Sequence, residues 1–123
     1  MNPFDLVKEF VVKFKRPIGR SQKNMDLGWN LIHEEYHEVL EEIQNRSMDE
    51  VNMMDLTEEL ADLQYVINYM AVVNNLPLME VFEEKHRANM SKVGNDGNPV
   101  LREDGKILKG PNYQPPNYER FFQ

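Results

Sequence analysis

The chain has 123 residues, 41% hydrophobic and 28% charged, which suits one domain with a single core and includes no apolar run long enough to cross a membrane. It contains no cysteine, which excludes disulfides and thiolate metal sites, and its start, "MNPFDLVKEF", lacks a signal-peptide pattern, so we expect a cytoplasmic protein. The formal net charge of -7 argues against binding to a nucleic-acid backbone, which needs a basic face.

Apolar residues recur at a 3.6-residue period over the first three quarters of the chain, which predicts four helices and an all-α fold. The expected helices cover about residues 3–14, 26–45, 49 or 55 to 73, and 77–92. We expect them to pack like a four-helix bundle, forming a helical core over about 3–92 of a single domain, 1–123. The tail, about 93–123, is rich in turn residues, and "LREDGKIL" within it predicts a small hairpin around Asp104 and Gly105.

The third expected helix carries acids on its apolar side. Its apolar stripe consists of Leu56, Leu63, Val66, Met70 and Val73. At about 100° per residue, Glu59 falls in the middle of this stripe and Asp62 falls just beside it. Because an unpaired carboxylate is costly to bury, two of them near the apolar side indicate a cationic partner.

The second expected helix supplies matching acids. Its main stripe is predicted to be Trp29, Ile32, Tyr36, Val39 and Ile43. Glu35 borders this stripe and Glu38 lies beyond it, whereas Glu34 points the opposite way. Glu35 and Glu38 can therefore meet Glu59 and Asp62 across a helix–helix contact. Four carboxylates with no cysteine suit a hard divalent cation, Mg²⁺ or Mn²⁺.

Other polar side chains extend this hypothesis towards a phosphate ligand. Lys85, Asn89 and Lys92 continue one face of the fourth expected helix, where two ammonium groups would suit a polyphosphate bridged by metal ions. Gln22, Asn24 and Trp29 are candidates for contacts to a base or sugar. The remaining acids of these helices are expected to face solvent: Glu41, Glu42, Glu83 and Glu84. His33 and His37 are expected to be surface residues.

A carboxylate-bridged di-iron bundle is an alternative, because "EEYH" and "EEKH" each contain a Glu-x-x-His pair, ending at His37 and His86. Glu9 and Glu59 would complete such a site. The helical projection argues against it, since Glu34, His37 and Glu9 all point away from their apolar stripes.

With these residues identified, the chain resembles the all-α nucleoside triphosphate pyrophosphohydrolases, the MazG-like and phosphoribosyl-ATP pyrophosphohydrolase-like superfamily, which includes dimeric dUTPases. The likeness covers most of the chain from Phe4. "EEYHE", 34–38, and "ELAD", 59–62, match the signature glutamates and aspartate of the family. The stretch "HRANMSKVGNDGNPVLREDGKILKGPNYQPP" is the most specific part of the resemblance.

The resemblance implies a metal-dependent enzyme that hydrolyses a nucleotide between its α and β phosphates, releasing pyrophosphate. It implies that Glu35, Glu38, Glu59 and Asp62 hold Mg²⁺, with Mn²⁺ as an alternative. Either Glu34 or Glu35 would act as the catalytic base, and the phosphates would contact Lys85, Asn89 and Lys92.

Two further expectations concern function without catalysis and assembly. A non-catalytic helical regulatory module that keeps the fold stays an alternative. Aromatic side chains beyond those one core needs, including Phe10, Phe14 and Tyr65, predict a homodimer or a dimer of dimers.

Overall fold

The computed structural model describes every residue from Met1 to Gln123. The chain folds into two compact units, Met1–Leu76 and Pro77–Gln123. Four α-helices and one short hairpin are present, which confirms the all-α expectation. By this division the fourth helix groups with the tail, and the single-domain organisation stays a prediction. None of the helices combines the length and apolar character that a membrane span requires.

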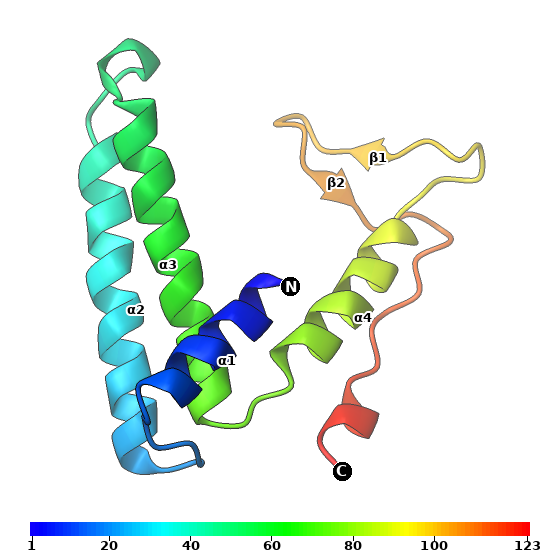
Figure 1. The fold of residues 1–123 in the computed structure, drawn as a ribbon. Helices are drawn as coiled ribbons and strands as arrows, with labels where there is room; N and C mark the ends of the chain where they lie inside the picture. Colours follow the sequence, from blue (N-terminus) through cyan, green and yellow to red (C-terminus); the bar gives the residue numbers. More distant parts are fainter. The chain divides into compact units, whose positions relative to one another are not determined.

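The first unit consists of α1 (Pro3–Lys13), α2 (Gln22–Ile43) and α3 (Met53–Val73). Figure 1 shows α2 and α3 lying side by side over their length, in opposite chain directions, with α1 packed across α3. A short 3₁₀ turn, Met48–Glu50, lies in the connection between the two long helices.

Polar side chains set the starts of these helices. The Oδ1 atom of Asn2 accepts a hydrogen bond from the Asp5 amide at 2.9 Å, and Asn52 Oδ1 accepts from the Asp55 amide at 3.0 Å. Ser21 caps α2 in the same way, through its Oγ and the Asn24 amide at 3.0 Å. Because Ser21 supplies that cap, α2 begins four residues earlier than the apolar period predicts.

The apolar core of this unit lies where α1 meets the C-terminal half of α3. It consists of Val7, Val11, Tyr69, Val72 and Val73, with Phe4 and Leu31 packed against it. No residue between Val51 and Ile67 is fully buried. The first half of α3 therefore packs on α2 without closing a core around it, and polar side chains there stay accessible to ligands.

The face that α2 turns towards α3 differs from the predicted stripe. Trp29, Tyr36 and Ile43 are 60%, 52% and 44% exposed, so that prediction was wrong for these three residues. Asn24 and Gly28 are buried instead, and Glu35 is half-buried on the same face, about two turns beyond Gly28. The pattern missed this face because a glycine and an asparagine do not count as apolar positions. Gly28 is needed there, since a Cβ atom would lie 2.1 Å from Met70 Sδ of α3.

The second unit consists of α4 (Leu78–Met90), the strands β1 (Val100–Leu101) and β2 (Ile107–Leu108), and a C-terminal 3₁₀ turn. The strands pair antiparallel, with Val100 opposite Leu108. Gly105 has a φ angle of 90° in the intervening turn, a conformation that favours glycine. The hairpin predicted around Asp104 and Gly105 is confirmed.

In this unit the tail packs on α4 through a buried carboxylate. Glu84 is only 6% exposed, so the prediction that it faces solvent was wrong. Its oxygens accept hydrogen bonds from Arg87 Nε and, at 3.3 Å, from Arg120 Nη2 of the tail. The helical period alone gave no sign of this burial, because the partner Arg120 lies 36 positions away in the tail. Glu41 and Glu83 are exposed as expected.

Candidate functional site

Three carboxylates from α2 and α3 converge in the open half of the first unit. Glu35 of α2 and Glu59 and Asp62 of α3 each offer an oxygen, and these atoms all lie within 4.8 Å of one another. Glu59 and Asp62 are three residues apart, so one turn of α3 presents both to the same side of the helix. Glu35 and Glu59 are half-buried, as expected for side chains on the packed faces of the two helices. The predicted meeting of the acids of both helices is therefore present in the structure for these three.

The electrostatics of this group are those of acids without a counter-charge. Burial, followed by the charges of Asp62, Glu38 and Glu34, raises the pKa of Glu35 above its ordinary value. Burial, followed by the charges of Glu38, Asp62, Glu35 and Glu58, raises the pKa of Glu59. Burial and mutual repulsion disfavour the ionised form of these carboxylates, and a bound cation would favour it.

No basic side chain of the first unit neutralises the cluster. The ion pair within Met1–Leu76 joins Arg46 to Glu42 at 3.7 Å, outside this group, and no side-chain hydrogen bond in that unit involves the carboxylates of Glu35, Glu59 or Asp62. Carboxylate oxygens without nitrogen or sulfur donors are the ligands that Mg²⁺ and Mn²⁺ prefer. The donor set thus fits a hard divalent cation.

Glu38 and Glu34 lie at the margin of the cluster. Both are exposed, and both contribute to the raised pKa of Glu35, Glu38 more strongly. Glu38 is also the charge that raises the pKa of Glu59 most after burial, which places it within electrostatic reach of both helices' acids. Glu34 is the residue before Glu35 on α2, so its side chain projects about 100° away from that of Glu35. It therefore borders the cluster from the solvent side.

The predicted phosphate contacts belong to the second unit. Lys85 and Asn89 are exposed on α4, and Lys92 is half-buried just beyond the end of that helix. The Nζ atoms of Lys92 and Lys109 lie 6.0 and 5.1 Å from the ring centroid of Tyr113. Reasoning from periodicity did not single out Lys109 or Tyr113, because they lie in the irregular tail, where no repeat marks a face.

The three candidates for base or sugar contacts have different surroundings. The buried Asn24 uses its Nδ2 to donate to the carbonyl oxygens of Pro17, Gly19 and Val73, at 3.3, 2.8 and 3.1 Å. This amide therefore ties the α1–α2 loop to the end of α3. Gln22 Nε2 donates to Asp26 Oδ1 at 2.8 Å on the surface. Trp29 is exposed and lies beside His33, with ring centroids 6.0 Å apart.

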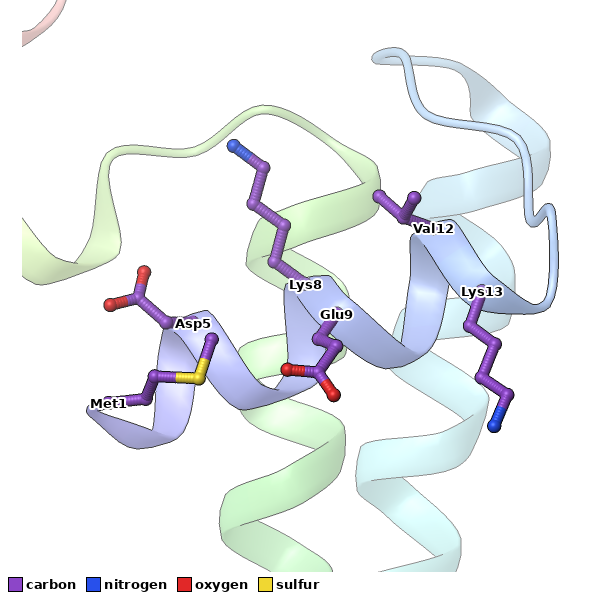
Figure 2. Close-up of a pocket in the computed structure, with 6 residues that line it drawn as sticks. All are labelled: Met1, Asp5, Lys8, Glu9, Val12 and Lys13. Carbon is purple, nitrogen blue, oxygen red and sulfur yellow. The ribbon is translucent and has the colours of Figure 1, made fainter.

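Neither a di-iron site nor the hollow along α1 brings suitable ligand side chains together. A di-iron site needs histidine ligands, and the cluster of Glu35, Glu59 and Asp62 contains none. The other ligands that such a site would use are exposed, namely Glu9, Glu34 and His37. A hollow along α1 is lined by side chains of Met1, Asp5, Lys8, Glu9, Val12 and Lys13. Figure 2 shows the Lys8 ammonium and the Glu9 carboxylate pointing in opposite directions, so the hollow does not gather them around a ligand.

The fold and the site define an all-α protein whose paired helices present carboxylates suited to a hard divalent cation. The sequence model of the family described as phosphoribosyl-ATP pyrophosphohydrolase matches residues 7–89, which is more than half of the chain. The chain belongs to this family, and with it to the MazG-like all-α nucleoside triphosphate pyrophosphohydrolase superfamily. No curated protein matches the sequence. Membership supports nucleotide pyrophosphohydrolase activity in general, and the matched segment contains all the acids of the cluster.

Proposed function

We propose that the protein is a divalent-cation-dependent pyrophosphohydrolase of a nucleoside triphosphate or related nucleotide, cleaving between the α and β phosphates. The observation that carries the proposal is the unneutralised group of Glu35, Glu59 and Asp62 in a member of this family. Glu38 is the proposed fourth ligand, since its charge acts on both half-buried glutamates. Mg²⁺ is the proposed cation, with Mn²⁺ as a substitute.

The roles of the chain's own residues follow from charge and access. A cation held by the carboxylates would supply charge neutralisation for the phosphate oxygens and a lowered pKa for a bound water. Glu34 is free on the solvent side of the cluster and is the proposed base that accepts the proton of the attacking water, with Glu35 as the alternative. Lys85, Asn89 and Lys92 are the proposed contacts of the phosphates, where the ammonium groups would stabilise the departing pyrophosphate.

The test is pyrophosphate release from a panel of ribo- and deoxyribonucleotides with Mg²⁺. Glu59→Gln keeps the shape of the side chain and removes its charge. Losing a direct ligand should cost at least as much as losing an outer partner, so we expect a decrease in kcat/KM of about 100-fold or more. The matched control is Glu58→Gln, because Glu58 is the exposed neighbour outside the group. Full activity of Glu59→Gln contradicts the proposal, and tight Mg²⁺ binding without turnover of any nucleotide favours a non-catalytic module instead.

We also propose that the protein acts as a homodimer. Phe10, Phe14 and Tyr65 form a contiguous aromatic group on α1 and α3, with ring centroids 4.7 Å apart for Phe10 and Phe14 and 5.6 Å for Phe10 and Tyr65. These side chains are 39%, 54% and 39% exposed. Aromatic rings gathered on a surface favour burial against a partner, and a second copy of the chain offers the same surface.

A further inference from the structure

The two histidines of α2 form a pair that the proposed hydrolysis does not use. His33 and His37 are four residues apart, one turn of helix, and their Nε2 atoms lie 3.3 Å from each other. Both residues are exposed, as the sequence predicts. Their rings meet edge to face with centroids 4.5 Å apart. The ring centroid of Trp29 lies 6.0 Å from that of His33, and the ring centroid of Tyr36 lies 5.8 Å from that of His37.

This spacing is what a chelated metal ion requires. Two imidazole nitrogens bound to one metal at about 2.0–2.1 Å lie about 2.9–3.4 Å apart for bond angles between a right angle and the tetrahedral angle. In the free protein, one Nε2–H can bridge to the other Nε2. When both nitrogens bind a metal, the donor ring moves its proton to Nδ1 through solvent, so no net proton is lost.

The pair is separate from the carboxylate cluster. At about 100° per residue, Glu35 projects from α2 about 180° away from the mean direction of His33 and His37. No acidic side chain completes a group of three ligands with the two histidines. Imidazole nitrogens favour late first-row divalent ions over Mg²⁺ or Mn²⁺, which prefer oxygen ligands. The two sites therefore differ in position and in the cation that they select.

We propose that His33 and His37 form a second, surface metal site that binds Cu²⁺, Ni²⁺ or Zn²⁺ through both Nε2 atoms, with water at the remaining positions. The five glutamates of α2 favour the approach of any cation to this helix. The geometry of the nitrogens, rather than this diffuse field, confines the ion to the histidine pair.

Trp29 gives a direct readout, because it is the only tryptophan of the chain and lies beside His33. Purified full-length protein without an affinity tag is titrated with Cu²⁺ and Ni²⁺ in excess Mg²⁺, the cation proposed for the carboxylate cluster. We expect these paramagnetic ions to quench Trp29 fluorescence, and excess EDTA to restore it. Zn²⁺ has a filled d shell, so it should bind in competition with Cu²⁺ while quenching far less.

The variants His33→Asn and His37→Asn should each raise the metal concentration for half-maximal quenching by about tenfold or more, since one of two ligands is lost. His86→Asn is the matched control, because the third histidine lies on α4, and it should titrate like the wild type. On immobilised Ni²⁺, the untagged wild type and His86→Asn should be retained equally. His33→Asn and His37→Asn should be retained less. Wild-type protein that shows no quenching, or histidine variants that titrate like the wild type, would overturn the proposal.

Discussion

At the scale of single residues, the position of Glu34 separates two roles within the acidic helix α2. Glu34 is exposed beside the carboxylate cluster, whereas the charge of Glu38 raises the pKa of both Glu35 and Glu59. We expect Glu34→Gln to lower kcat by about 100-fold or more, the contribution of a general base, without changing the Mg²⁺ concentration for half-maximal activity. Glu38→Gln should raise that Mg²⁺ concentration instead. Steady-state rates over a Mg²⁺ titration distinguish the two effects.

Glu41→Gln is the control for both variants, because Glu41 is exposed and contributes nothing to the raised pKa of Glu35 or Glu59. If Glu34→Gln keeps the wild-type kcat, Glu34 is not the base, and Glu35 becomes the candidate. If Glu34→Gln changes only the Mg²⁺ concentration for half-maximal activity, Glu34 is a ligand of the cation.

Glu84 makes stability depend on pH in the second unit. The hydrogen bond from Arg87, supported by Arg120, lowers the pKa of Glu84 below its ordinary value of 4.5 despite burial. Its ion pairs therefore stabilise the folded unit above the unfolded pKa, and that stability is lost as the pH falls through the lower folded pKa. We expect Glu84→Gln to increase hydrogen exchange of α4 and the tail at pH 7, with a difference from wild type that shrinks in acid.

Hydrogen exchange of wild type and variant, compared at the same pH by mass spectrometry, measures this difference segment by segment. Glu83→Gln is the matched control, since Glu83 is exposed and its carboxylate forms no ion pair in the unit. A Glu84→Gln protein with wild-type exchange at pH 7 would show that the tail is held by other contacts.

At the scale of the elements, one glycine controls how closely α2 and α3 pack. A Cβ atom on Gly28 would lie 2.1 Å from Met70 Sδ and 3.1 Å from Met70 Cβ. Alanine gains about 0.8–1.0 kcal/mol of helix propensity over glycine, but overpacking typically costs about 1–3 kcal/mol. We therefore expect Gly28→Ala to lower the free energy of unfolding by on the order of 1 kcal/mol.

A double-mutant cycle with Met70→Ala tests the cause, using urea unfolding followed by circular dichroism. Without the sulfur atom only the Cβ contact remains, so Gly28→Ala should no longer destabilise the protein in that background. The coupling between the two positions should reach about 1 kcal/mol. Additive effects of the two substitutions would show that the contact does not limit the packing of α2 on α3.

The same elements show what a sequence can predict here. Four helices and the hairpin were predictable because an apolar period, caps and a glycine turn are local signals. Glu59 was identifiable as an inward acid because it interrupts a clear apolar stripe. The contact face of α2 was not, since Gly28 and Asn24 carry it. Nor was the burial of Glu84, whose partner Arg120 lies 36 residues away in the C-terminal 3₁₀ turn. Long-range pairings in such segments leave no periodic trace.

At the scale of the whole molecule, the aromatic group on α1 and α3 argues for self-association. Phe10 contacts both Phe14 and Tyr65, so it is the centre of that surface. We expect light scattering coupled to size-exclusion chromatography to give twice the chain mass of 14.6 kDa for the wild type. Phe10→Ser removes the central ring and should shift the protein towards the mass of one chain, because the apolar area buried between copies falls.

The control for this prediction must lose an exposed apolar side chain outside the aromatic group. Met48→Ser does so, since Met48 is 78% exposed in the connection between α2 and α3. It should keep the wild-type mass, and circular dichroism should show native helix content for both variants. A wild type that stays at the mass of one chain at all concentrations contradicts the dimer. If Phe10→Ser and Met48→Ser keep the dimer equally, the second copy binds through another face, and these rings are exposed for a different reason.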